Sequence, residues 1–346
     1  MSRWGVLKQL VRHRPRGWRD YLLNYVSEKQ KAGRAYGRPV HILVEPTNYC
    51  NLGCEVCETG AGDLGRAQGF MTLENFNRIL DKIPSLNSML FYFMGEPFLN
   101  RAAYDMIAAA RARGIWVETC TNGDLVDPER LVACDLNLVS FQIGGLVQET
   151  HKVYRVNSLL PRVIERMKAV RRLRDERGLV HPEINLGFIV MRHNEHEVPD
   201  VPAFAREVGA DRFEIVKPCV RTIEQGRKFL TQADEYWIYD RRKFEEGELI
   251  PLDKPKNWCG IIYHSMGINW NGDVVSCCRD PRGKYVLGNI LKQPLNEIWN
   301  GPKFRELRRM VATRQAEMDL CRLCSGYWRP EIKSRDENAP QLSPTP

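Results

Sequence analysis

The sequence predicts an α/β protein, a partial (β/α)6 barrel of parallel strands followed by a small α+β domain that contains a β-hairpin. Between Pro39 and Lys217, six β-like runs alternate with helical patterns, the order typical of a parallel sheet with right-handed crossovers. Several of these runs are continuously apolar, as expected of strands covered on both faces. Beyond Thr231 the alternation stops and a hairpin signature follows. Six units are too few for a closed eight-unit barrel, so the predicted barrel is open.

The predicted elements alternate regularly along the first domain. The strands are predicted at 40–46, 88–94, 114–120, 136–143, 184–190 and 212–218. The helices between them are predicted at 72–83, 101–114, 148–177 and 195–209. Thr72 is the expected N-cap of the first helix, and Gly114 lies just past the end of the second. In such sheets, chemistry gathers at the carboxyl ends of the strands.

The C-terminal part has a different pattern. Two β-rich runs within 265–278 are joined by Asn271-Gly272, the dipeptide favoured in a type I′ turn. Helices are predicted at 295–299 and 303–314. The predicted domains are therefore a basic segment at 1–38, a core at 39–235 and a smaller domain at 236–330, with a disordered tail at 331–346.

The net charge of +8 lies in the first 38 residues, which hold ten Lys or Arg and two Asp or Glu, while the remainder is neutral. Apolar residues recur there at helical spacing, which predicts two short helices broken near Pro15. This face could lie on an anionic membrane or an acidic partner, or it could belong to a helix packed on the main domain with its charges in water. The apolar residues are Trp4, Leu7, Val11, Trp18, Leu22 and Tyr25.

Composition narrows the class of protein further. The sequence shows no secretory signal and no apolar run near twenty residues, so a cytoplasmic protein is expected. Its eleven cysteines are an odd number and are grouped at short spacings. Such grouping points to metal binding rather than to disulfides.

Three cysteines, Cys50, Cys54 and Cys57, follow the first predicted strand within eight residues. A structural zinc site needs four protein ligands, and no histidine lies within the next ninety residues to supply the fourth. An iron–sulfur cubane can instead be held by three thiolates, with one iron left for another ligand. The loop therefore predicts a [4Fe–4S] cluster.

This Cys-x3-Cys-x2-Cys spacing after a first strand resembles the radical S-adenosylmethionine (SAM) superfamily. The resemblance implies that the open iron binds SAM and that an electron from the cluster cleaves it to a 5′-deoxyadenosyl radical. Two further motifs and a lone arginine also resemble parts of the family's SAM site. The first motif, Met94–Pro97, is expected to end the second strand. The second motif forms the turn after the third strand, and the arginine lies on a later helix. The implied SAM contacts are Gly95, Glu96, Pro97, Thr121, Asn122, Gly123 and Arg155.

The chain departs from the family pattern at two places. Val56 stands before the third cysteine, where relatives usually carry an aromatic residue. Strand four reads Gln-Ile-Gly-Gly at 142–145, where relatives often carry Ser-x-Asp-Gly. The second departure removes a carboxylate, so no role is carried over for that position.

The later cysteines resemble the SPASM extension of the superfamily, and their number suits its shorter "twitch" form with one auxiliary [4Fe–4S] cluster. The resemblance implies four ligands, with Cys278 as a substitute for Cys277. Without the upstream match, Cys-x2-Cys alone would fit a zinc knuckle equally well. The implied ligands are Cys259, Cys277, Cys321 and Cys324.

The predicted function is abstraction of hydrogen from a C–H bond. Four thiolates on the auxiliary cluster favour electron relay, and therefore oxidation, while epimerisation and peptide or lipid modification stay open. The expected substrate is a small molecule, a peptide or a lipid, and the resemblance implies a flavodoxin or ferredoxin as the electron donor. Peripheral membrane contact through residues 1–38 is a further prediction. Cys120 and Cys219 end strands at the predicted mouth, where a thiol could donate hydrogen, although such cysteines are more often packing residues.

A zinc-stabilised nucleic-acid-binding protein is the rival hypothesis. It would use the basic N-terminus on phosphates and the later cysteines for structure. The neutral main body carries no aromatic and basic stripe beyond residue 38, so no nucleic-acid partner is expected.

Overall fold

The computed structural model describes residues 15–253, 256–326, 331 and 333. The first predicted short helix and almost all of the predicted tail lie outside these residues.

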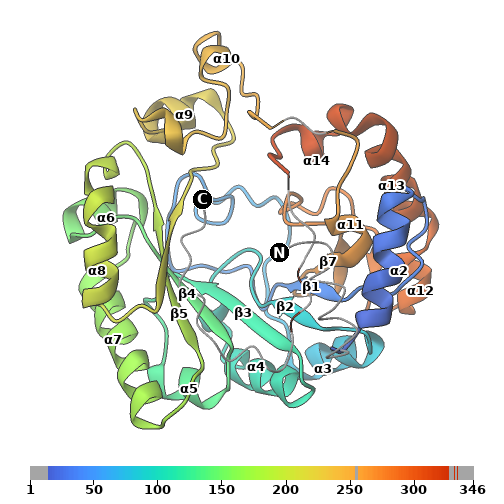
Figure 1. Ribbon diagram of the computed structural model, residues 1–346, viewed down its shortest axis with the longest axis horizontal. Helices are drawn as coiled ribbons and strands as arrows, with labels where there is room; N and C mark the ends of the chain where they lie inside the picture. Colours follow the sequence, from blue (N-terminus) through green and yellow to red (C-terminus); the bar gives the residue numbers. More distant parts are fainter. Residues whose placement is uncertain (1–14, 254–255, 327–330, 332, 334–346) are drawn as a thin grey trace.

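A nine-stranded sheet forms the centre of the molecule, and its first six strands are parallel and lie in sequence order (Figure 1). All six predicted strands of the core are present, so the predicted parallel α/β architecture is confirmed. Helices cover the outer side of the curved sheet (Figure 1), and β6 ends it, as expected of an open barrel. The strands are β1 His41–Val44, β2 Ser88–Leu90, β3 Trp116–Thr121, β4 Leu138–Ile143, β5 Glu183–Ile189 and β6 Arg212–Val216.

The predicted C-terminal hairpin continues this same sheet. β7 (Ser265–Ile268) pairs in parallel with β1, and β8 (Asp273–Val275) pairs antiparallel with β7. A short strand that was not predicted, β9 (Gly288–Asn289), completes this edge. The sheet therefore links the C-terminal part directly to the first strand of the core.

The type I′ prediction for the hairpin turn is wrong. Gly272 has a positive φ of 85°, but Asn271 does not, whereas a type I′ turn needs both. The Gly272 amide donates to the Asn269 carbonyl at 2.9 Å, so the turn spans 269–272 and begins one residue earlier than predicted. Trp270 explains the longer loop, because its indole N–H donates to the Ala67 carbonyl at 3.2 Å and ties the turn to the core.

The outer helices follow the predicted ranges closely. Thr72 caps α3 as predicted, because its side chain accepts from the Asn75 amide. The predicted helix at 148–177 is divided in two, with Asn157 at a positive φ of 75° between the halves. The helices are α3 Leu73–Lys82, α4 Ala103–Ala112, α5 Pro128–Ala133, α6 Gln148–Tyr154, α7 Leu160–Glu176 and α8 Val201–Glu207, with 3-10 turns η1 Pro97–Leu99 and η2 Glu195–Asp200.

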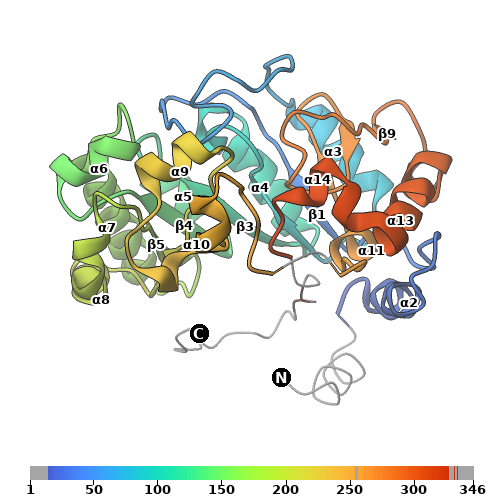
Figure 2. The ribbon, with the colours of Figure 1, turned by 90° about the horizontal axis from the view of Figure 1, so that it is seen from above.

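Several of the remaining helices lie around the mouth of the barrel, at the carboxyl end of the sheet, whereas α11 directly precedes β7 at the amino end. Figure 1 shows α9 and α10 on one side of this mouth and α13 and α14 on the other, and Figure 2 shows the same layout from above. They are α9 Ile223–Phe229, α10 Arg241–Glu245, α11 Ile261–His264, α12 Leu295–Trp299, α13 Pro302–Arg314 and α14 Asp319–Arg322, with 3-10 turns η3 Asp234–Tyr236 and η4 Gln315–Glu317.

Helix α2 (Trp18–Lys29) packs against the main body through a polar face. Glu28 is fully buried, and it accepts from the indole of Trp258 at 3.2 Å and pairs with His264 at 3.1 Å. Leu23 and Val26 point outward and are 46% and 43% exposed. For α2, the interpretation of a packed helix holds, although its outer side is partly apolar. No described helix has the length and apolar character needed to cross a membrane.

Candidate metal and cofactor site

The loop that carries Cys50, Cys54 and Cys57 follows β1 at the carboxyl end of the sheet. Cys54 is buried and the other two thiols are half-buried. The Gly53 amide donates to the Val156 carbonyl at 3.1 Å, which fixes the loop to the segment after α6. We call residues Cys50–Cys57 the cluster loop.

Ion pairs from the other side of the mouth fasten the cluster loop. Lys228 on α9 contacts both carboxylate oxygens of Glu55 at 2.7 Å. Arg221, just before α9, donates to Glu58 at 2.9 Å. These bonds join the loop after β1 to the segment after β6, so side chains connect two distant strands of the parallel sheet at its carboxyl end.

Burial favours the protonated form of two thiols of the cluster loop, Cys50 and Cys54. Burial raises the pKa of Cys50 to about 12, and the neighbouring Cys54 and Cys57 raise it further. Burial also raises the pKa of Cys54, although Arg155 opposes this shift. Three thiols this close would repel one another as thiolates. A cationic iron–sulfur cluster removes that cost, because it takes the thiolates as ligands.

Glu96 connects the two motifs assigned to SAM binding. Its buried carboxylate accepts from the Thr121 hydroxyl at 2.7 Å and from the Asn122 amide at 2.8 Å. Burial raises the pKa of Glu96 to about 7, although these hydrogen bonds lower it. The Gly123 amide donates to the Thr121 hydroxyl at 3.0 Å, which completes the turn. Sequence order alone did not show that Glu96 organises this turn.

Gly95 brings Glu96 against the cluster loop. It has a φ of 80°, and a Cβ there would lie 2.5 Å from the Tyr49 carbonyl oxygen. The Glu96 amide donates to that same carbonyl at 2.8 Å. The motif lies in the loop after β2 rather than at the end of the strand, which stops at Leu90. Pro97 begins the 3-10 turn that follows.

Asn122 and Arg155 reach the thiols themselves. The Asn122 side chain donates to Asn51 at 2.9 Å and lies 4.0 Å from the Cys50 sulfur. Arg155 follows α6 directly, and its Nη1 lies 3.9 Å from the Cys54 sulfur. The Nε atom of Arg155 is buried and has no hydrogen-bond partner among the described residues.

These features fit the groups that the sequence implies. A buried guanidinium with an unused N–H suits a carboxylate, and a buried carboxylate suits an ammonium, which are the two charged groups of an amino acid. All seven predicted SAM contacts and the cluster loop thus lie in one region at the strand ends. No three His, Cys, Asp or Glu side chains of the described residues are grouped so as to hold a metal ion, so the ligand set stays a prediction.

The auxiliary cysteines come from separate segments. Cys259 lies before α11 and Cys277 follows β8, while Cys321 is on α14 and Cys324 lies just after it. Burial raises the pKa of Cys259 to about 12, and Cys321 and Cys324 raise it further. Burial also raises the pKa of Cys277, with added contributions from Cys278 and Cys259. These thiols are near enough to affect one another's pKa, while their assembly around one cluster stays a prediction.

A group of residues around Cys219 was not predicted. The Cys219 sulfur accepts from Arg221 and Arg279, each at 3.0 Å, and from the Tyr239 hydroxyl at 3.5 Å. Burial alone would raise the pKa of Cys219, but the two arginines outweigh it and lower that pKa. Burial raises the pKa of Cys120 to about 11, so its sulfur stays a thiol. Nothing in the spacing of Arg279 and Tyr239 indicated that they meet Cys219.

A second unpredicted pair joins the core to the C-terminal part. Glu45 follows β1 directly, is fully buried and pairs with Arg66. Arg66 also donates to the Pro281 carbonyl at 2.6 Å. In the sequence, only the position of Glu45 directly after a buried strand could have indicated that this carboxylate has a role.

Family comparison agrees with this geometry. Residues 44–204 match the radical SAM superfamily. Residues 259–325 match SPASM, an iron–sulfur cluster-binding domain. The chain is a radical SAM enzyme with a C-terminal SPASM domain. A radical SAM domain uses SAM and a [4Fe–4S] cluster, and a SPASM domain holds auxiliary iron–sulfur clusters.

Individual relatives support the same family. A tungsten-containing aldehyde ferredoxin oxidoreductase cofactor-modifying protein of Pyrococcus furiosus is 24% identical over 314 residues, covering 82% of this chain and 87% of the relative. Mycofactocin maturase MftC of Mycobacterium ulcerans is 26% identical over 294 residues, covering 78% and 77%. The structure of Streptococcus suis SuiB bound to precursor peptide SuiA has a TM-score of 0.60 at 15% identity, covering 93% and 80%. These matches favour the radical SAM hypothesis over the zinc-stabilised rival.

Proposed function

We propose that this enzyme abstracts hydrogen from a C–H bond of its substrate in a two-electron oxidation, for which an auxiliary [4Fe–4S] cluster would serve as the electron relay. The observation that carries this proposal is the cluster loop with Arg155 and Glu96 beside it, at the carboxyl ends of parallel strands. When bound, SAM and the cluster supply a 5′-deoxyadenosyl radical. The residues of the chain orient SAM and exclude water.

Each residue has a defined part in this proposal. Cys50, Cys54 and Cys57 ligate the first cluster. Arg155 binds the SAM carboxylate through its unused Nε, and Glu96 binds the SAM ammonium. The turn at 121–123, held by Glu96, positions the ribose. Cys259, Cys277, Cys321 and Cys324 ligate the auxiliary cluster.

For the substrate, we propose a peptide or a cofactor precursor. MftC is named as a maturase, SuiB was crystallised with a precursor peptide, and the Pyrococcus protein is named for modifying a cofactor. The sequence left small molecules and lipids open as well, and a substrate screen with deuterated candidates separates these classes. Transfer of deuterium to 5′-deoxyadenosine identifies the molecule attacked.

Two partners are part of the proposal. A flavodoxin or ferredoxin supplies the electron, in the cytoplasm. The outer face of α2 supports peripheral contact with an anionic membrane, because Leu23 and Val26 are exposed beside Arg19 and Lys29. Vesicles containing phosphatidylserine should bind the wild-type protein more strongly than the Leu23→Glu/Val26→Glu variant.

The central experiment measures 5′-deoxyadenosine after anaerobic reduction with dithionite in the presence of SAM. Wild-type protein should form it, and Cys50→Ala, Cys54→Ala and Cys57→Ala should each abolish its formation. Cys134→Ala is a matched control, because Cys134 is buried in the core away from the mouth and donates to the Leu131 carbonyl at 3.1 Å. Continued formation in the three cluster-loop variants would refute the proposal.

A further inference from the structure

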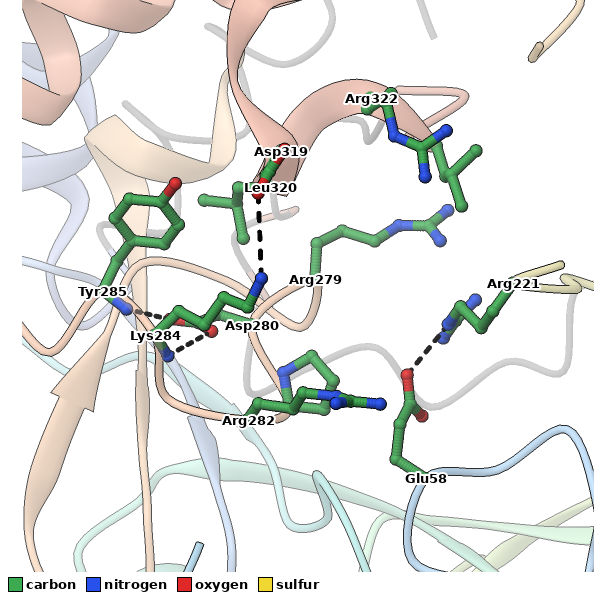
Figure 3. Close-up of a pocket in the computed structure, with 12 residues that line it drawn as sticks. Glu58, Arg221, Arg279, Asp280, Arg282, Lys284, Tyr285, Asp319, Leu320 and Arg322 are labelled. Carbon is green, nitrogen blue, oxygen red and sulfur yellow. Dashed lines mark hydrogen bonds and ion pairs between the residues drawn. The ribbon is translucent and has the colours of Figure 1, made fainter. Parts of the chain in front are cut away.

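A cavity of about 270 Å³ lies outside the SAM contacts described above (Figure 3). Its walls come from the cluster side of the mouth, at Glu58 and Arg221, and from the C-terminal domain, at Arg279 and Arg322. Glu58 follows Cys57 directly, and Arg322 lies between Cys321 and Cys324. A molecule in this cavity would therefore lie between the two groups of predicted cluster ligands.

The lining of this cavity is basic. Five Lys or Arg side chains face three Asp or Glu side chains, although the body of the protein beyond residue 38 is neutral overall. The three carboxylates already have partners within the lining. These are Glu58 with Arg221 at 2.9 Å, Asp319 with Lys284 at 3.7 Å, and Asp280 with the backbone amides of Lys284 and Tyr285 at 2.8 and 2.9 Å.

The arginines converge on the cavity from separate segments. Arg221 and Arg279 are held close together because both donate to the Cys219 sulfur at 3.0 Å. Arg282 lies across the cavity from Arg322, and its carboxylate partner, Asp63, is outside the lining (Figure 3). Arg322 makes no side-chain hydrogen bond or ion pair to another described residue. Because each guanidinium has five N–H donors, the group offers more donors than the lining has acceptors.

We propose that this cavity binds an anionic oxygen group of the substrate, a carboxylate or a phosphate. Guanidinium groups bind both through paired N–H···O bonds, which give orientation as well as affinity. An anion held here would anchor the substrate between the SAM site and the auxiliary cluster. The inference rests on the proposed function for the existence of a substrate, but the anion site itself can be tested without turnover.

The test is calorimetric titration of the anaerobically purified holoprotein, without reductant, at constant ionic strength. Inorganic phosphate is one probe and glutarate is the other, so the preferred probe distinguishes a phosphate from a carboxylate source. Saturable binding is expected for at least one of them. Arg282→Gln and Arg322→Gln should each weaken this binding about tenfold, the loss expected for one charge-assisted interaction. Arg305→Gln, at an exposed position on α13, is the control and should bind as the wild type does.

Two results would overturn the cavity proposal. One is the lack of saturable binding for both anions in protein with full iron content. The other is equal affinity in the wild type, Arg282→Gln and Arg322→Gln. SAM cleavage by the same wild-type preparation is scored separately. Cleavage without anion binding overturns the cavity alone, and anion binding without 5′-deoxyadenosine overturns the proposed function alone.

Discussion

The two groups of cysteines in this protein are assembled in different ways. The cluster loop carries three within eight residues, so their proximity follows from local chain geometry. The auxiliary cysteines lie before α11, after the hairpin and at α14, between residues 259 and 324, so they can meet only through the packing of these separate segments. The first site therefore depends on a loop and its fastenings, whereas the second depends on the packing of the C-terminal domain.

The largest expected effect comes from removing one cysteine from each group. Cys54→Ala and Cys321→Ala should each lose about four irons, because each breaks one [4Fe–4S] site. Only Cys54→Ala should reduce 5′-deoxyadenosine formation by about a thousandfold or more, since SAM is cleaved at the first cluster. Iron and sulfide analysis together with chromatography of the nucleoside measures both effects. Equal loss of SAM cleavage in the two variants would contradict this division of roles.

The contrast also explains what could be predicted from the sequence. The six parallel strands and the two strands of the hairpin follow from local periodicity, and they appear as predicted. The spacing of Cys50, Cys54 and Cys57 is also local, and their role as cluster ligands stays a prediction. The actual turn at 269–272 depends on Trp270 reaching Ala67, which is more than two hundred residues away in sequence. The arginines on Cys219 likewise come from distant segments. No local pattern encodes these contacts, because they exist only once the distant segments have packed together.

The second effect concerns packing under the auxiliary site. Arg308 on α13 is fully buried and donates to the Ile262 carbonyl at 3.0 Å and to the Trp299 carbonyl at 2.8 Å. Arg308→Met keeps the bulk but leaves these carbonyls unsatisfied, which should lower the free energy of unfolding by about 3 kcal/mol. Thermal denaturation measures the loss, and Arg305→Met on the exposed side of the same helix is the control.

Iron analysis of Arg308→Met tests whether the auxiliary site and the cluster loop depend on separate parts of the fold. Ile262 lies three residues after Cys259, so the variant should lose auxiliary iron before it loses iron from the cluster loop. SAM cleavage per remaining first cluster should then be close to that of the wild type. Loss of both clusters in parallel would show that the two sites do not depend on separate parts of the fold.

The third effect concerns the contribution of Arg155 to SAM binding at the first site. Arg155→Gln removes the guanidinium whose buried Nε has no described partner. Losing one charge-assisted bond to the SAM carboxylate should weaken SAM binding about 10- to 100-fold. Equilibrium dialysis with labelled SAM measures this change in protein of equal iron content. Arg162→Gln, at an exposed position in α7, should keep the wild-type affinity, and unchanged binding in Arg155→Gln would remove Arg155 from the SAM site.

The smallest effect is the pH dependence of Glu96. Burial raises the pKa of Glu96 to about 7, so in the SAM-free protein its contribution to stability is present below about pH 4.5 and is lost as pH rises through about 7. SAM binding should change in the opposite direction, because only the ionised carboxylate attracts the SAM ammonium. Affinity should rise about tenfold between pH 6 and pH 8 as the ionised fraction grows.

Glu96→Gln separates this titration from that of the ligand. The SAM amino group itself titrates near this range, but it does so equally with both proteins, so the difference between their pH profiles belongs to Glu96. The variant should show a flatter rise in SAM affinity between pH 6 and pH 8, whatever its affinity at any one pH. If both proteins gave the same slope, the carboxylate would serve only to hold the turn at 121–123. The hydrogen bonds from Thr121 and Asn122 would then be its whole function.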